Sequence, residues 1–313
     1  MNARRRWWMR SFGYLRAHFA LYVMLLPGFL FLFLYKLPSY YGLTIAFKDF
    51  SMFLGNNPLE AIALSDWVGF SHFQRLLMNE DFLLVLKNTL VISLMKIVFL
   101  FPVPIVTAIM LNEIRSSLYK RLSQTFIYIP YFFSWVLVFG MFYSIIGTYG
   151  LVNQLIGYLG MKPLQVFTNS GAFRGLLVLT EGWKENGWNA IIYLAAISAI
   201  DPTLYEAARV DGAGKFMQIR HITLTGLFPT IVLMLIIRVG HILQAGFEQI
   251  LVMYNPTVYD VADVIETYVY RVGMGQMDFS LGTALGLFNG VVALILIVGA
   301  NAVSRKLLSR SIW

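Results

Sequence analysis

The chain has 313 residues, of which 58% are hydrophobic and 13% are charged, and its formal net charge is +8. A soluble domain carries about 25% charged residues, so this composition excludes an ordinary soluble protein and favours a membrane protein. Cysteine is absent and the four histidines are scattered, so neither a disulfide framework nor a metal site is expected. Because the basic residues alternate with apolar runs instead of forming one stripe, a nucleic-acid partner is not expected either.

Six apolar runs follow one another along the chain, and each is long enough to cross a hydrocarbon core of about 20 helical residues. They predict an all-α membrane protein with six transmembrane helices, in which residues 1–313 form a single domain. The expected spans are residues 19–47, 88–111, 126–146, 173–200, 227–247 and 281–303.

The distribution of lysine and arginine predicts the orientation of these spans, because basic residues gather on the cytoplasmic side. Fourteen of them lie at the termini and in the second and fourth connecting segments, and five lie in the alternate segments, which are acidic. Both termini are therefore expected in the cytoplasm, with a basic N-terminus at 1–20, an external loop at 48–87 and a cytoplasmic loop at 201–226. The fourteen are Arg4, Arg5, Arg6, Arg10, Arg16, Arg115, Lys120, Arg121, Arg209, Lys215, Arg220, Arg305, Lys306 and Arg310.

The loop at 201–226 contains a glycine pair followed by lysine, which suggests a phosphate-binding loop. A Walker A motif needs a glycine five residues before the second glycine and a Ser or Thr after the lysine. Here Arg209 and Phe216 occupy those two positions. We therefore expect no ATP binding by this chain.

The same loop has the signals of a helix–turn–helix. Asp201 suits a helix N-cap and Pro202 suits the first helical position, while Gly212 and Gly214 are expected to end the helix by adopting positive φ. Residues 215–221 would form a second short helix that leads into span five. The alternative is a solvated loop whose charges only mark its side of the membrane.

At this point the chain resembles a known family. The stretch EAARVDGAGKFMQIRHITL is similar to the cytoplasmic EAA loop of binding-protein-dependent ABC importer permeases, although Thr225 replaces the final proline of the pattern. The resemblance implies a type I ABC importer permease fold and a surface that couples to an ATPase. The residues implied in this coupling are Glu206, Ala207, Ala208, Asp211 and Gly212.

The stretch YIPYFFSW resembles permeases of the carbohydrate group. Two further stretches, GWKENGWNAIIYLAAISAIDPTLYEAA and AGFEQILVMYNPTVYDVADVIETYVYR, resemble the branch that imports oligosaccharides derived from complex polysaccharides. What this implies is a bacterial cytoplasmic-membrane protein that pairs with a second, different permease and with a cytoplasmic ATPase dimer. An extracellular or periplasmic binding protein would deliver the sugar. ATP and magnesium would be bound by the ATPase, so this chain would hold no cofactor and would not be an enzyme.

Polar residues inside the spans are the candidates for a sugar pathway, because aromatic rings stack on sugar faces and polar groups bind hydroxyls. In span four, Glu181 and Lys184 lie three residues apart and are expected to pair on one helix face. In span five, Arg238, His241 and Gln244 recur at the same spacing; Arg238 would serve either an interhelical salt bridge or the pathway. The resemblance to sugar permeases adds further positions to these polar residues. Together the candidates for contact with the sugar are Trp135, Lys184, Glu185, Trp188, Arg238, Gln244, Gly246 and Phe247.

The charges inside the spans suggest the type of substrate. Five basic residues, Lys36, Lys96, Arg174, Lys184 and Arg238, oppose only Glu181 and Glu185. An electropositive path would favour an acidic oligosaccharide such as an alginate- or pectin-like uronate. The alternatives are an ion-coupled secondary transporter and an ABC permease for a solute other than sugar.

Overall fold

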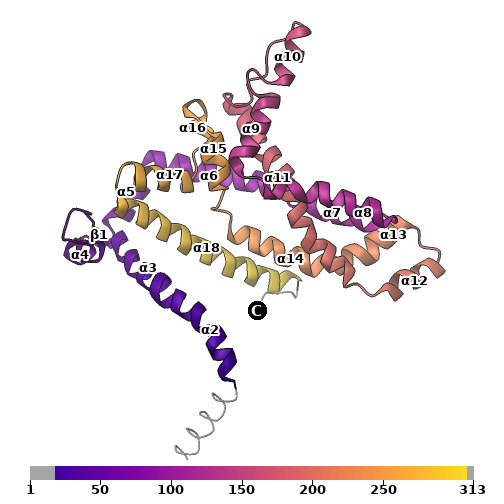
Figure 1. Cartoon of the computed structure of the whole chain (residues 1–313), viewed down its shortest axis with the longest axis horizontal. Coiled ribbons are helices and arrows are strands. Elements are labelled where there is room, and N and C mark those ends of the chain that lie inside the picture. Colours follow the sequence, from indigo (N-terminus) through magenta and orange to yellow (C-terminus); the bar gives the residue numbers. More distant parts are fainter. Residues whose placement is uncertain (1–17, 309–313) are drawn as a thin grey trace, which may run out of the picture.

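The computed structural model describes residues 18–308, and expectations that rest on residues 1–17 and 309–313, including the N-terminal arginine cluster, lie outside this range. Figure 1 shows that the described chain is built almost entirely of long and short helices. The exception is a short antiparallel pair of strands, β1 (Lys48–Asp49) and β2 (Asp66–Trp67), in which Lys48 pairs with Trp67. The all-α prediction is therefore confirmed.

Each of the six expected spans has a counterpart in the described chain. Five helical runs are long and apolar enough to cross a membrane, and α11 (Ser170–Ser198) supplies a sixth when it is joined to α12 (Pro202–Val210) after a bend of 68°. The five runs are Phe19–Phe47, Glu80–Glu113, Trp135–Tyr158, Lys215–Gly240 and Phe279–Lys306.

Several predicted boundaries differ from the structure. Residues 80–87, assigned above to an external loop, are the first turns of α6 (Glu80–Leu100), because the Asn79 side chain caps this helix by accepting from the Asp81 N–H at 2.8 Å. The third span begins at Trp135 because the chain before it forms a 3-10 turn around Pro130. The fifth ends at Gly240 rather than at residue 247.

The remaining helices connect and extend these spans. The first span consists of α2 (Phe19–Phe31), a π-helical turn (Leu32–Lys36), α3 (Leu37–Gly42) and a 3-10 turn (Leu43–Phe47). The other helices are α4 (Pro58–Leu64), α5 (Ser71–Leu77), α7 (Pro102–Glu113), α8 (Ser117–Tyr128), α9 (Trp135–Ile146), α10 (Leu151–Tyr158), α13 (Lys215–Gln218), α14 (Leu224–Gly240), α15 (Phe247–Met253), α16 (Tyr259–Ala262), α17 (Ile265–Tyr270) and α18 (Phe279–Leu308).

The two ends of the molecule carry different connections. In Figure 1, α4 and β1 lie at one end, and α12 and α13 lie at the other. The first span diverges from the bundle, and none of the residues in its apolar window is buried inside the chain.

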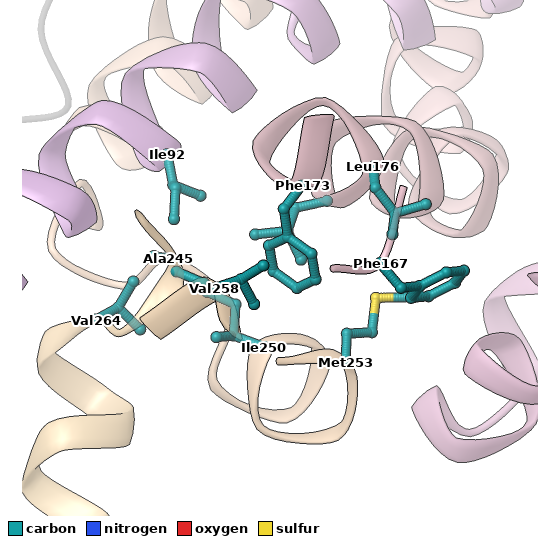
Figure 2. Close-up of a cluster of buried hydrophobic side chains, with 11 residues drawn as sticks. Ile92, Phe167, Phe173, Leu176, Ala245, Ile250, Met253, Val258 and Val264 are labelled. Carbon is teal, nitrogen blue, oxygen red and sulfur yellow. The ribbon is translucent and has the colours of Figure 1, made fainter. Parts of the chain in front are cut away.

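A buried hydrophobic cluster fixes α15 against α6 and α11. Figure 2 shows Ile92 of α6, Phe173 and Leu176 of α11, and Ile250 and Met253 of α15 converging on one core. Burying side chains of this size stabilises a fold by about 1.5–3 kcal/mol each. The cluster therefore holds the chain that follows span five close to the N-terminal part of α11.

Candidate functional site

A cavity of about 320 Å³ lies between the helices of spans two, four and five. Its wall combines apolar, aromatic, amide and charged side chains. The lining residues are Lys96, Leu100, Phe101, Val103, Pro104, Trp135, Glu181, Gly182, Glu185, Asn186, Asn189, Tyr193, Met234, Arg238 and Gly246.

Glu181 joins three helices through two ion pairs. Its carboxylate accepts from Lys96 Nζ of α6 and, at 2.9 Å, from Arg238 Nη2 of α14. The predicted pairing of Glu181 with Lys184 is wrong, because cations from two neighbouring helices reach this carboxylate. Since the Lys96 side chain is 1% exposed, it depends on such a partner: an unpaired charge at that depth would be strongly destabilising.

Lys96 also supports the unwound chain that follows span five. Its ammonium donates to the Ala245 carbonyl at 2.5 Å and to Gln249 Oε1 at 2.6 Å. Because the helix stops at Gly240, the Ala245 carbonyl needs a donor from elsewhere in the molecule. Gly246 then turns the chain with φ of +102°, and a β-carbon at this residue would lie 3.0 Å from Lys96 Nζ.

This unwinding separates residues that the sequence suggested would share one helix face. Arg238 belongs to α14, whereas His241 forms its C-cap and Gln244 lies in the non-helical stretch, where it is exposed. The interhelical salt bridge considered for Arg238 is present. Its partner, Glu181, lies 57 residues away and could not be identified from spacing.

The aromatic side of the wall is built around Lys184. Its ammonium donates to the Tyr131 carbonyl at 2.8 Å and to Glu185 Oε1 at 3.2 Å, and it lies 5.3 Å from the centre of the Trp135 ring. Trp188 stacks on Tyr131 with ring centres 4.4 Å apart. Lys184 is therefore held in the wall and not directed into the cavity.

The structure brings some of the predicted pathway residues together and separates others. Trp135, Glu185, Arg238 and Gly246 line the cavity, and Lys184 and Trp188 lie in the layer behind them. Gln244 lies outside the cavity lining. Phe247 lines a second cavity of about 510 Å³ between α17 and α18.

Several lining residues were missed as site residues. Asn186, Asn189 and Tyr193 lie along one side of α11 with Glu185, which was predicted, and this helical spacing could have identified the two asparagines. Lys96 was counted among the charges inside the spans but was not named as a site residue, although a lone charge in an apolar run usually faces a cavity or a partner.

The charge excess counted from the sequence is absent from the cavity lining. Lys96 and Arg238 are matched there by Glu181 and Glu185. Lys36 is exposed on the first span, and Arg174 donates to Asn88 Oδ1 at 2.7 Å, away from the cavity. Lys96 is paired within its own chain, with Glu181.

The second candidate site is the EAA segment, residues 201–223. As predicted, Asp201 caps α12: its side chain accepts from the Thr203 N–H at 2.9 Å, and this bond lowers the pKa of its carboxyl. Gly212 has φ of +79°, which supports its predicted role. Gly214 has an ordinary φ of −66° and instead forms the N-cap of α13, so its predicted positive φ is wrong.

The EAA segment is anchored at few points and exposes much of its surface. Tyr205 Oη lies 3.0 Å from Thr223 Oγ1, in the π-helical turn that leads into α14, and Lys215 pairs with Glu113 of α7 at 2.7 Å. The surface that remains open is mixed, with charged, small and apolar side chains. Its exposed residues include Leu204, Glu206, Ala207, Val210, Asp211, Gly212, Phe216 and Met217.

A multi-span helical bundle with a polar cavity between its spans and an exposed short helix at one end is the architecture of a membrane permease. Residues 101–311 match the family of binding-protein-dependent transport system inner membrane components. The chain belongs to this family and is a multi-pass inner-membrane permease subunit.

Named relatives extend the similarity over most of the chain. A polygalacturonan/rhamnogalacturonan transport system permease protein of Bacillus subtilis (strain 168), YteP, is 44% identical over 91% of this chain and 88% of its own length. Protein LplB of the same organism is 42% identical over the same shares. A chain from the crystal structure of a bacterial ABC transporter involved in the import of the acidic polysaccharide alginate has a TM-score of 0.85 and 39% identity, covering 95% of this chain and 99% of that chain.

Proposed function

We propose that the chain is a translocation-path subunit of an ATP-driven importer for acidic oligosaccharides built from uronic acids. The observation that carries this proposal is the 39% identity, over 95% of the chain, to a permease of an alginate importer. The 44% identity to a polygalacturonan/rhamnogalacturonan permease supports it, because that system also handles a uronate polymer.

The proposed assembly contains a second, different permease, a pair of cytoplasmic ATPases and an external binding protein. A related alginate transporter has been solved in complex with a periplasmic protein that holds an alginate pentasaccharide. ATP and magnesium would be held by the ATPases, so this chain would bind no cofactor.

The cavity wall supports a sugar path through its chemistry. Asn186 and Asn189 offer amide donors and acceptors for hydroxyl groups, Trp135 offers an aromatic face, and Arg238 offers a cation. Trp188 and Lys184 back this wall. Gln244 and Phe247 remain proposed contacts for a part of the path outside the cavity.

Vesicle uptake would test the proposed function through its energy source. The assembled complex, reconstituted with its binding protein, should import an oligogalacturonate or an oligoalginate only when ATP is supplied on the ATPase side. Import should continue after the proton gradient is collapsed. Import that needs the gradient and not ATP would instead identify an ion-coupled secondary transporter.

The proposed ATPase contact lies on the exposed face of α12. Replacing Glu206 by Lys should abolish sugar-stimulated ATP hydrolysis and weaken co-purification of the ATPase, because it reverses a charge on that face. The substitution should have little effect on folding, because Glu206 is exposed. Asp66→Lys, the same charge change on exposed β2, is the matched control and should leave co-purification unchanged. Normal stimulation in Glu206→Lys would exclude this contact.

The proposed orientation places both termini and the EAA segment in the cytoplasm. Accessibility tags at residues 1, 118 and 313 should be cytoplasmic, and tags at residues 57 and 162 should be external. A cytoplasmic tag at residue 162 would contradict the proposed arrangement of spans three and four.

A further inference from the structure

The three cations that lie in or just behind the cavity wall differ in how far their hydrogen-bond donors are occupied. Lys96 has three donors and three acceptors around it: Glu181, the Ala245 carbonyl and Gln249. Lys184 is occupied by Glu185 and the Tyr131 carbonyl, and its side chain is 8% exposed. Neither lysine is therefore available to a passing solute.

Arg238 differs from both lysines. A guanidinium carries five N–H donors, and the hydrogen bond that Arg238 makes uses Nη2 toward Glu181 at 2.9 Å. Its side chain is 41% exposed and lines the cavity. Arg238 therefore presents donors to the cavity while one nitrogen is held in place.

The pairing of charges around the cavity also indicates Arg238 as the accessible cation. Lys184 and Glu185 neutralise each other, whereas two cations, Lys96 and Arg238, share the single carboxylate of Glu181. With the carboxylate of Glu266, which accepts from the Gly246 N–H at 3.2 Å, the six groups have three formal charges of each sign. Because Lys96 is buried and Arg238 is partly exposed, Arg238 is the cation that a solute in the cavity can reach.

We infer that Arg238 is the specificity-determining residue of this cavity and that it binds the carboxylates of the passing oligosaccharide one at a time. Glu181 and Lys96 are positioning residues: Lys96 fixes Glu181, and Glu181 fixes one nitrogen of the guanidinium. The planar fork that remains matches the two oxygens of a carboxylate. This inference rests on the proposed function, since it requires an acidic substrate.

The arrangement also suits transport rather than tight binding. Glu181 already offsets part of the charge of Arg238, so a carboxylate meets a partly satisfied cation in an open cavity. Conduction requires a site that is favourable enough to enter and weak enough to leave. An anchored arginine with spare donors meets both requirements.

Charge rescue at residue 238 tests the inference. The chain has no cysteine, so Arg238→Cys introduces the only thiol in it, and Glu181 keeps Lys96 as its partner, so the fold should persist. The complete complex with its binding protein is reconstituted, and import of an oligogalacturonate or an oligoalginate is measured. The thiol is then modified with aminoethyl methanethiosulfonate, which adds a positive charge, or with sulfonatoethyl methanethiosulfonate, which adds a negative one.

We expect Arg238→Cys to lower import by about tenfold or more, as removing one partner of a close charge pair does. The aminoethyl group should restore most of it, and the sulfonatoethyl group should restore none. Arg115→Cys, at an exposed arginine between α7 and α8, is the matched control and should respond to neither reagent. The wild-type complex treated in the same way accounts for thiols of the partner subunits.

Several results would overturn the inference. Equal effects of the two reagents would assign Arg238 a structural role, and an unreactive thiol would mean that this side chain does not face the cavity. Both results assume that the wild-type complex imports one of the two sugars with ATP. Failure of the wild-type complex to import either would instead count against the proposed function.

Discussion

The cavity wall and the EAA segment are both rich in charge, but they use it in opposite ways. In the wall, Lys96 and Glu181 are bonded within the chain and have little contact with solvent. In the EAA segment, Glu206 and Arg209 are exposed, and Val210 beside them is 88% exposed. The difference teaches that the wall charges stabilise the fold of this chain, whereas the EAA charges and apolar groups remain available to another protein.

The largest expected contrast between the two regions is in stability, and it follows from removing the Glu181 carboxylate that Lys96 and Arg238 share. Glu181→Leu leaves Lys96 buried without its counter-charge, and breaking a buried pair in this way costs about 3–5 kcal/mol. Glu206→Leu, at an exposed position, should change stability by less than about 0.5 kcal/mol. Denaturant unfolding of both variants in detergent measures the contrast.

A second substitution sharpens that result. Adding Lys96→Met to Glu181→Leu should recover part of the lost stability, because it removes the unpaired charge. Recovery should be incomplete because the Ala245 carbonyl then loses its donor. Equal stability of Glu181→Leu and Glu206→Leu would remove the distinction between the regions.

Glycine-to-alanine substitutions compare the two regions by the stability cost of adding a side chain at a backbone position with positive φ, and the expected effects are smaller. Gly246→Ala should cost about 2 kcal/mol, because positive φ is unfavourable with a side chain and the new methyl group crowds Lys96. Gly212→Ala has the same type of φ but open space around it, so about 1 kcal/mol is expected.

Gly214→Ala is the matched control for this series, because Gly214 has an ordinary φ and nothing near the added methyl group. Because alanine is a poorer N-cap than glycine, the Gly214→Ala variant should lose about 0.5 kcal/mol, less than either of the other two. Thermal unfolding of the three variants would contradict the argument if Gly214→Ala proved the most damaging.

The smallest expected effect lies at the start of α12. Asp201→Ala removes the cap on the Thr203 N–H and should speed hydrogen exchange there, while Asp201→Asn should preserve protection. The pKa of Asp201 is lowered in the folded chain, so the ionised cap is present above its ordinary pKa and is lost as pH falls through the lowered value. Exchange that is unchanged in Asp201→Ala would show that the cap does not hold this helix end.

Local signals in the sequence were sufficient for much of the fold and for the EAA segment. Hydropathy located the spans because burial in lipid depends on composition over about 20 residues. The cap at Asp201 and the turn at Gly212 were readable for the same reason, since each depends on a few neighbouring residues.

The cavity could be predicted only in part, because its contacts join distant segments. Gly240 is compatible with a helix end, but the sequence around it does not show that the chain stays unwound as far as Gly246. The unwound chain is stabilised by Lys96, about 150 residues away in sequence. The expected partner of Glu181 was its neighbour on the same helix, but cations on two other helices lie closer to it in space. Pairings of this kind follow from helix packing and not from spacing.

The rigid length of α11 has a mechanical consequence. Its last residue, Ser198, is separated from α12 by three residues, and Glu181 lies on the same continuous helix. At 1.5 Å per residue, Glu181 is about 25 Å from that end, so a tilt of about 5° there would displace its carboxylate by roughly 2 Å. A displacement of that size is enough to part Glu181 from Arg238, now 2.9 Å apart. A small rotation of α11 at the end next to the EAA segment would therefore move the cavity wall by an atomic-scale distance.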